Sequence, residues 1–399
     1  MPDRMTFQFL DVGMGDGTLV QIRTDDDDFD RLMLVDFGER RSPFEIAHED
    51  ALAYLVEQID ENSRARRWPT PYVDMLVLTH PDGDHYNKIT ALLDATYPRY
   101  PTRRLRFGDL YYAGNASEYG RVISRRLAGR VVAANGLAPM LQNYHSPLDA
   151  DDELVPWRTY GDVRVYVLSS NWPTRRDRNK NRKSVVLMFE LDGTKVILPG
   201  DATRATENHI LRDVVRPDPT LLSCHALKLG HHGSNGSTGD AWVTATAPLA
   251  VFASGDQVWA HPYCRAICKF ITADTLQTYF ADDSYYTCGD GNRYYNNATR
   301  LAICMNLWYF VQRRRETLTD EATGNTVTAA RGTCHGVQWE LSIDAGEEMV
   351  LSRTDTFLPR ARNVRAPFVC AGAVPGDGRR DELLALVDAL PPATDPAPA

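Results

Sequence analysis

Short apolar runs that fit β-strands alternate with helix-like segments along about two thirds of this 399-residue chain, and this alternation restricts the fold more than any other feature. It is typical of α/β proteins, in which helices cover the faces of sheets. The strand-like runs lie at residues 7–11, 18–22, 31–37, 74–79, 163–168, 184–191, 195–198, 226–229 and 249–253. Helical signals mark residues 44–60, 87–96, 203–214 and 262–273. The sequence therefore predicts an α/β fold.

The character of the chain changes near residue 276. Tyr, Asn, Gly and Thr become frequent there, which predicts a β-rich extension or insertion packed on the first part. A short helix is expected at residues 381–390, followed by a flexible tail rich in Pro and Ala. We therefore divide the chain into a domain over residues 1–275, an extension over 276–380 and a terminal segment over 381–399.

Composition narrows the class of protein. Apolar residues make up 43% and charged residues 24%, as in foldable globular chains, and the net charge of −9 argues against a surface that binds nucleic acid everywhere. The chain contains no apolar run of the ~18–20 residues that a membrane span needs, and no signal peptide is recognisable. Seven scattered cysteines fit reduced thiols. We expect a cytoplasmic protein without a membrane partner.

A dense cluster of metal-ligand types follows the strand-like run 74–79. Residues 79–85 read Thr-His-Pro-Asp-Gly-Asp-His, so four ligand types occur within six residues: His80, Asp82, Asp84 and His85. A loop at a strand end can turn successive side chains toward one point. Imidazole and carboxylate groups bind zinc, manganese or iron. The cluster therefore predicts a metal site.

Three later strand-like runs also end in such side chains. Asp201 follows residues 195–198, His231 and His232 follow 226–229, and His261 comes after 249–253. Strand ends in α/β layers are where sites usually form. We expect the four strand ends to meet at one place.

The whole set, in this order, resembles the metallo-β-lactamase fold superfamily. The pattern His-x-Asp-x-Asp-His at residues 80–85 is similar to its signature. Further motifs, at residues 11–16 (Asp-Val-Gly-Met-Gly-Asp), 200–201 (Gly-Asp) and 227–234 (Leu-Lys-Leu-Gly-His-His-Gly-Ser), resemble the hydrolase domain of ComEC-type DNA-uptake proteins and their stand-alone relatives. The resemblance covers residues 5–275 and implies an αββα sandwich with the β-rich extension added to it.

The resemblance also implies a site for two divalent metal ions, Zn or Mn. One ion would be held by His80, Asp82 and a bridging Asp201, and the other by Asp84, His85, Asp201 and a late histidine. His261 has the spacing of that last ligand and is preferred, which leaves His231 as the proton donor and His232 beside the substrate. The alternative, His231 or His232 as the ligand, stays open. Asp84 is assigned to catalysis as well.

The family pattern is incomplete in one place. Many members supply a further histidine to the first ion, but residues 181–187 contain none, so that ion would have fewer ligands. His145 is a remote substitute. Asp36 and Asp16 are expected to orient metal-bound side chains rather than to bind metal.

Several residues near the motifs fit a phosphate substrate. Ser234 lies in a Gly-rich turn that can approach phosphate oxygens closely. Arg182 and Lys183 end a basic run at 175–183, and Ser184 follows it. Two more basic runs lie at 103–106 and 121–130. Trp172, Trp259 and Tyr263 can stack on bases or simply pack.

Three functions remain in view. The first is a metal-dependent phosphodiester hydrolase, a nuclease acting on DNA, with bacterial defence as a conceivable setting. The second is a phosphodiesterase for a small substrate such as a cyclic nucleotide or a choline-phosphate ester. The third is a non-catalytic binding module with a decayed site. A regulatory protein partner or a homo-oligomer fits the unassigned extension.

Overall fold

The computed structural model describes most of the first 253 residues and parts of the rest. The described residues are 2–10, 12, 15–39, 49–132, 144–174, 176–253, 261, 263, 266, 269–270, 285–287, 293–295, 303–305, 317–319, 326–328, 337–347, 349–355, 364–366, 384 and 387–390. The predicted tail and Trp259 lie outside them.

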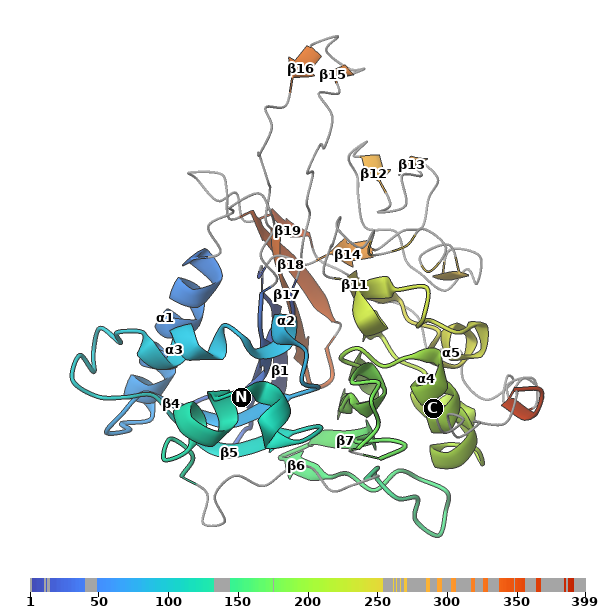
Figure 1. Cartoon of the computed structure of the whole chain (residues 1–399), viewed down its shortest axis with the longest axis horizontal. Coiled ribbons are helices and arrows are strands. Elements are labelled where there is room, and N and C mark those ends of the chain that lie inside the picture. Colours follow the sequence, from blue (N-terminus) through green and yellow to red (C-terminus); the bar gives the residue numbers. More distant parts are fainter. Residues whose placement is uncertain are drawn as a thin grey trace.

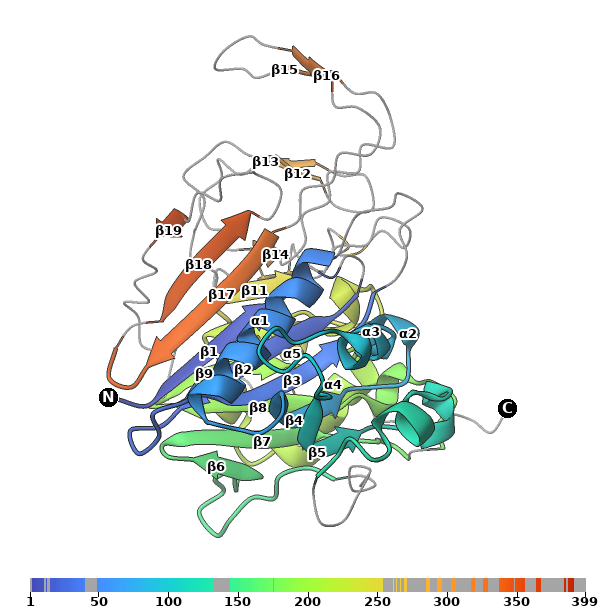
Figure 2. The ribbon, with the colours of Figure 1, turned by 90° about the vertical axis from the view of Figure 1, so that its left-hand side faces the viewer.

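The first sheet combines strands from both ends of the chain, in the order β19-β18-β17-β1-β2-β3-β4-β5 (Figures 1 and 2). Its strands are β1 (Arg4–Phe9), β2 (Gly17–Arg23), β3 (Arg31–Phe37), β4 (Tyr72–Leu78), β5 (Arg106–Tyr112), β17 (Val337–Asp344), β18 (Val350–Asp355) and β19 (Val364–Ala366). The pairs β3·β4 and β4·β5 are parallel, whereas β1 is antiparallel to β2 and β17. Because β5 is the last strand in this order, it forms one edge of the sheet.

The second sheet has the order β14-β11-β10-β9-β8-β7-β6. Its strands are β6 (Arg158–Tyr160), β7 (Val163–Ser169), β8 (Val186–Leu191), β9 (Thr194–Leu198), β10 (Ala226–Lys228), β11 (Ala250–Ala253) and β14 (Ile303–Met305). Strands β9, β10 and β11 run parallel, so their carboxyl ends meet at one edge. Two separate ribbons pair β12 (Tyr285–Thr287) with β13 (Arg293–Tyr295) and β15 (Thr317–Thr319) with β16 (Thr326–Thr328).

A hydrophobic core joins the two sheets face to face. The ring of Phe9 in β1 stacks on Phe252 in β11 at 4.0 Å between centroids, and Phe7 meets Phe189 of β8 edge-on at 5.2 Å. These side chains are fully buried. Phe7 and Phe9 share one face because strand side chains alternate with a period of two.

Helices cover the outer face of each sheet. On the first sheet, Leu55 of α1 (Glu49–Ala65) and Leu92 of α3 (Ile89–Asp94) pack in one buried cluster with Leu34 of β3. On the second sheet, η4 (Ile210–Val214), which continues the helix α4 (Arg204–His209), and α5 (Asp240–Thr246) pack against buried strand residues. In Figure 1, α1 and α3 lie on one side of the strands and α4 and α5 on the other, and Figure 2 shows α1 and α3 in front of the strands. The predicted α/β class is confirmed.

The C-terminal part returns to the N-terminal strand. In β17, Leu341 pairs with Phe7, and Asp344 forms an ion pair with Arg4 at 2.5 Å. A segment assigned to the extension thus supplies a strand of the first sheet, while the boundary at residue 275 stays a prediction. Near the C-terminus, Val387 is buried in the cluster of the second helical layer. Among the described helices, none has the length and apolar character that crossing a bilayer requires.

Candidate metal centre

Loops from both sheets bring the predicted ligands together. His80 follows β4, and His85 lies in the helical turn α2 (Gly83–Tyr86) just after it. Asp201 follows β9, and His231 and His232 lie in the turn η6 (Gly230–Gly233) after β10. All of these segments follow carboxyl ends of parallel strands, which explains why residues as distant in the sequence as His80 and His232 meet.

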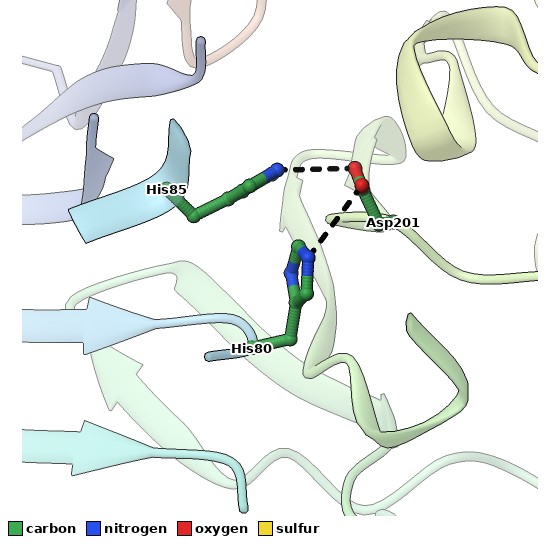
Figure 3. Close-up of side chains that lie close together, drawn as sticks. All are labelled: His80, His85 and Asp201. Atoms are coloured by element: carbon green, nitrogen blue, oxygen red, sulfur yellow. Dashed lines mark ion pairs between the residues drawn. The ribbon is translucent and has the colours of Figure 1, made fainter. Parts of the chain in front are cut away.

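Asp201 lies between two histidines, with one carboxylate oxygen directed to each (Figure 3). Its Oδ2 is 3.5 Å from Nε2 of His80, and its Oδ1 is 3.2 Å from Nε2 of His85. Both histidines are fully buried and Asp201 is 3% exposed. The carboxylate therefore has the orientation of a bridge between two neighbouring positions.

The remaining candidates divide between these two positions. Near His80 lie Asp82, whose Oδ2 is 3.7 Å from Nε2 of His80, and His231, whose Nε2 is 3.9 Å from Oδ2 of Asp201. We call His80, Asp82 and Asp201 the first half-site. The second half-site is His85, Asp201, Asp84 and His232.

The second half-site is closely spaced. Nε2 of His232 is 3.6 Å from Oδ1 of Asp201 and 3.9 Å from Oδ2 of Asp84. In the described part of the chain, cation-capable groups include His80 with His85 and Asp201, and Asp84 with His85 and His232. Each residue in such a group offers a ligand atom within 4.8 Å of the others.

The donor set fits a divalent cation. Within the described residues, Nε2 of His80, Nε2 of His85 and Oδ1 of Asp201 are buried and accept or donate no hydrogen bond. Leaving buried polar atoms unpaired is costly, and proteins rarely do so without a reason. A cation bound by imidazole nitrogens and carboxylate oxygens supplies that reason.

The charge distribution points the same way. Burial alone would raise the pKa of Asp201, but the surrounding histidines, His232 first, outweigh it and hold that pKa well below its usual range. Burial opposes the charged form of His85, yet Asp201 and Asp36 raise the pKa of His85 well above its usual value. The buried carboxylate thus stays ionised and requires positive charge around it.

A hydrogen-bond network fixes His85 from behind. Oδ2 of Asp36 lies 2.8 Å from Nδ1 of His85 and accepts a 2.6 Å bond from the hydroxyl of Thr79, while Oδ1 accepts the Thr79 N–H at 2.7 Å. A carboxylate at Nδ1 keeps a proton on that nitrogen, so Nε2 is the ring nitrogen that can offer a lone pair to a cation. Asp36 thus contacts the ring of His85 on the side away from Asp201. The expectation that it orients a metal-bound side chain stays a prediction.

Lys228 was not singled out in the sequence analysis. Its Nζ lies 2.6 Å from Oδ2 of Asp16, and both side chains are almost fully buried. Burial disfavours the ammonium, but Asp16 and Asp201 raise the pKa of Lys228. The available signal was a lysine inside an otherwise apolar strand, Ala-Leu-Lys-Leu. This pair anchors Asp16, which lies 3.7 Å from Nδ1 of His85.

Two glycines permit backbone-to-backbone contact behind the ligands. The Asp16 N–H donates to the Asp84 carbonyl at 3.0 Å, and the Gly38 N–H donates to the Asp16 carbonyl at 2.9 Å. A Cβ on Gly38 would lie 2.3 Å from the Asp84 carbonyl and 2.4 Å from the His85 nitrogen, and one on Gly15 would lie 1.9 Å from the Gly38 oxygen. Only glycine fits these two positions.

Backbone strain collects at the same place. His231 and His232 both have left-handed conformations (φ 49° and 51°), as does Asp36 (φ 57°). Such conformations cost about 1–3 kcal/mol each and recur at functional sites. At His231 and His232, this left-handed backbone carries two adjacent imidazole rings that both lie near the carboxylate of Asp201.

The predicted substrate-binding residues are placed differently from one another. Lys183, in the turn η3 (Asn181–Lys183), is buried and pairs with Glu118 of η1 (Ala116–Tyr119) at 2.8 Å. Arg182 lies 3.9 Å from Asp177. Within the described chain, neither side chain forms a hydrogen bond or ion pair with a residue of the half-sites, and their role as substrate ligands stays a prediction.

The two serines support the local backbone. The hydroxyl of buried Ser184 accepts the Asp201 N–H at 3.1 Å, next to the bridging carboxylate. The hydroxyl of Ser234 accepts the Gly236 N–H at 3.1 Å. Ser184 therefore shapes the turn that carries Asp201, and Ser234 shapes the Gly-rich turn after His232.

Lys180, in the 175–183 run, contacts a predicted ligand. Its Nζ donates to Oδ1 of Asp82 and to the Pro81 carbonyl, both at 3.0 Å. Burial opposes ionisation of Asp82, but His80 and Lys180 hold the pKa of Asp82 below its usual range. The neighbouring Asn181 lies with Nδ2 3.2 Å from Nε2 of His231. This end of the run borders the first half-site.

His261 lies beside the second half-site. Its ring is nearly parallel to that of His232, 6.1 Å away, and 5.4 Å from that of His231. The cation-capable groups of the described chain contain His232 rather than His261. Metal binding by His261 stays a prediction. His145, the remote substitute, lies with its ring 6.3 Å from His209 and is in none of these described groups.

Glu207 supports the turn that follows the histidine pair. Buried on α4, it accepts the Thr238 N–H at 2.6 Å and the Gly239 N–H at 2.7 Å. Burial raises the pKa of Glu207 to about 7, above the 4.5 of an exposed carboxyl. The folded state therefore binds this proton more tightly than the unfolded state does.

Because of this linkage, the contribution of Glu207 to the free energy of unfolding should fall as the pH rises. Its contribution should be fully present below pH ~4.5 and should decline by about 3 kcal/mol as the pH passes 7. Urea unfolding of the wild type and of Glu207→Gln between pH 4.5 and 8 tests this. With rising pH, the free energy of unfolding of the wild type should fall relative to that of Glu207→Gln. A pH-independent difference would contradict the assignment.

Comparison with known proteins gives a remote relationship. No family model matches the chain. The chain is 25% identical over 232 residues to "ComE operon protein 3" of Bacillus subtilis (strain 168), a match that covers 57% of this chain and 25% of that relative. A solved structure from Parabacteroides distasonis ATCC 8503, provisionally described as a metal-dependent hydrolase, aligns with a TM-score of 0.30 and 13% identity over 63% of this chain and 81% of that one. The chain thus has weak homology to part of a longer protein.

Proposed function

We propose that this chain is a metal-dependent phosphodiester hydrolase of the metallo-β-lactamase fold that uses two divalent ions, Zn²⁺ or Mn²⁺. One observation carries the proposal. The two oxygens of buried Asp201 face Nε2 of His80 and Nε2 of His85 separately, and three of these four atoms, Oδ1 of Asp201 and both Nε2 atoms, lack hydrogen bonds within the described chain. The layer order, helix–sheet–sheet–helix, supports the fold, and we assign residues 1–275 together with β17 to the hydrolase unit.

The residues divide between two ions. His80, Asp82 and Asp201 would hold one, and His85, Asp84, Asp201 and His232 the other. We favour His232 over His261 because its Nε2 lies 3.6 Å from Oδ1 of Asp201 and because it belongs to a cation-capable group with Asp84 and His85. When bound, two such ions lower the pKa of a water molecule and clamp the oxygens of a phosphodiester.

His231 is the best-placed proton donor. Its side chain is 29% exposed, more than that of any histidine in the two half-sites, so substrate can reach it. Asn181 orients the ring from one side. A protonated His231 would give its proton to the leaving alkoxide, and its Nε2 lies 3.9 Å from Oδ2 of Asp201, at the edge of the first half-site.

We propose nucleic acid, and DNA in particular, as the substrate. The ammonium of Lys180 borders the first half-site and is 41% exposed, so it can contact a phosphate oxygen while it holds Asp82. The resemblance to ComEC-type proteins and the 25% identity to ComE operon protein 3 support the same class.

A cleavage assay tests the activity. The purified protein is incubated with Mn²⁺, Zn²⁺ or Mg²⁺ and with single- or double-stranded DNA, RNA or bis-p-nitrophenyl phosphate, beside Asp84→Ala. We expect DNA cleavage that the variant loses. Cleavage of the small ester alone would replace DNA by a small phosphodiester as substrate. Activity that is absent with every metal, or unchanged in the variant, would overturn the proposal.

Replacing Lys180 should weaken metal binding at the first half-site. Lys180→Met removes the bond that orients Asp82 toward His80, and loss of such an outer contact costs ~10–100-fold in metal affinity. Isothermal titration with Mn²⁺ should show one weakened site and one unchanged site, with partial recovery in Lys180→Arg. The control, Arg178→Met, removes an exposed charge two residues away. Tighter Mn²⁺ binding by Lys180→Met would mean that Lys180 competes with the ion.

A further inference from the structure

Arginines gather in one segment of this acidic chain. Residues 99–132 contain eight arginines, no lysine and two carboxylates, a formal charge of +6, whereas the whole chain carries −9. The arginines are Arg99, Arg103, Arg104, Arg106, Arg121, Arg125, Arg126 and Arg130. A guanidinium group binds phosphate through two parallel hydrogen bonds, which an ammonium cannot do. The composition therefore favours a phosphate-bearing partner.

The fold joins two arginine runs that are separate in the sequence. The Phe107 N–H donates to the Arg130 carbonyl at 2.9 Å, and the Val132 N–H donates to the Phe107 carbonyl at 2.8 Å. Residues 130–132 thus lie beside the start of edge strand β5, which places Arg130 next to Arg104 and Arg106. Burial and repulsion from these neighbours lower the pKa of Arg130. Arg104 and Arg106 are exposed and form no ion pair within the described chain.

The second arginine run, at residues 121–130, begins beside the metal centre. Tyr119 packs its ring 4.9 Å from Tyr86, which ends the turn α2 that carries Asp84 and His85. The turn η2 (Val122–Leu127) follows and buries Ile123 and Leu127. Arg121 and Arg125 are left exposed beside it. At ~3.3 Å per residue, the seven residues of β5 span about 20 Å.

We propose that these exposed arginines form an anchoring surface for the phosphate backbone of a nucleic-acid strand, leading from the metal centre to the start of β5. We define the arginine face as the exposed Arg104, Arg106, Arg121 and Arg125 together with the partly buried Arg130. Its length of about 20 Å matches roughly six base pairs at 3.4 Å each. The inference rests on the proposed function, and it adds that the strand is held at a distance from the scissile bond.

The salt dependence of DNA binding tests the arginine face. Binding of metal-free protein to a labelled 24-base-pair duplex and to its single strand is measured by fluorescence anisotropy from 50 to 300 mM NaCl. Two double variants, Arg104→Gln/Arg106→Gln and Arg121→Gln/Arg125→Gln, each remove two positive charges. For the form that the wild type binds more tightly, each should lower the slope of log K against log[NaCl] by about 1.8 for duplex or about 1.4 for single strand.

A charge-matched control separates this surface from general electrostatics. Arg164→Gln/Arg216→Gln removes two exposed arginines from the second sheet and its helical layer, and its slope should equal that of the wild type. Equal losses in all three double variants would overturn the proposal. So would variants that bind DNA normally but lose binding to vesicles of phosphatidylglycerol, since the face would then serve a membrane surface.

Catalysis distinguishes failure of this inference from failure of the proposed function. Hydrolysis of bis-p-nitrophenyl phosphate, which is too small to reach the arginine face, should keep its kcat/KM in both arginine variants. Cleavage of long DNA should show a raised KM with an unchanged kcat. If the small ester is cleaved but long DNA keeps the wild-type KM in the variants, the arginine face is wrong and the hydrolase remains. If nothing is cleaved, the proposed function is wrong whatever the variants bind.

Discussion

Asp201→Asn should abolish hydrolysis and reduce the bound metal from two ions to one or none. The amide replaces one anionic oxygen by an N–H₂ group, which cannot bind an ion and points at a histidine nitrogen 3.2 or 3.5 Å away. A metal ion contributes several kcal/mol to stabilising the transition state, so we expect a loss of about 10³-fold or more in kcat. Elemental analysis after dialysis and a phosphodiesterase assay measure both effects.

Asp213 offers a control for this prediction. Asp213→Asn changes a half-exposed aspartate on η4 that pairs with His209 outside the half-sites, and it should keep both ions and activity. Asp201→Asn with two ions and wild-type kcat would mean that Asp201 does not bridge.

Gly38→Ala should disrupt the centre without changing any ligand. The added methyl would lie 2.3–2.4 Å from the backbone of Asp84 and His85, closer than real carbon contacts, so the turn that carries two candidate ligands must move. Forced overpacking costs about 1–3 kcal/mol. We expect a lower melting temperature and loss of metal from the second half-site, measured by thermal unfolding with and without Mn²⁺.

Gly83 offers a matched control within the same ligand loop. A Cβ there meets no atom within 4 Å, so Gly83→Ala should keep the melting temperature and the Mn²⁺-dependent rise in stability. Similar behaviour of the two variants would show that the close approach behind Asp84 does not position the ligands.

Sequence patterns located the candidate ligands because each lies just after a strand. His80, Asp201 and the histidine pair follow apolar runs, and parallel strands bring such ends to one edge. This reasoning depends on local hydrophobic patterning, and the same patterning correctly predicted the α/β class. The sequence could not decide between His232 and His261, because the position of His232 depends on two consecutive left-handed residues that no propensity favours.

Other features depend on contacts between distant residues. Lys183 looked like part of a basic surface, but it lies buried against Glu118, 65 positions away. The strand-like residues 337–344 return to β1 and join the first sheet. The two arginine runs read as separate patches until the backbone pairing of Phe107 with Arg130 joins them. A single sequence carries no direct signal for such pairings.

Anomalous diffraction from crystals soaked in Mn²⁺ tests the central claim most directly. Two-ion sites hold their metals ~3.5–4 Å apart. We predict two anomalous peaks at that separation, one beside each oxygen of Asp201, with His80 and Asp82 around one and His85, Asp84 and His232 around the other. A single peak away from Asp201, or no peak at saturating Mn²⁺, would contradict the two-ion centre.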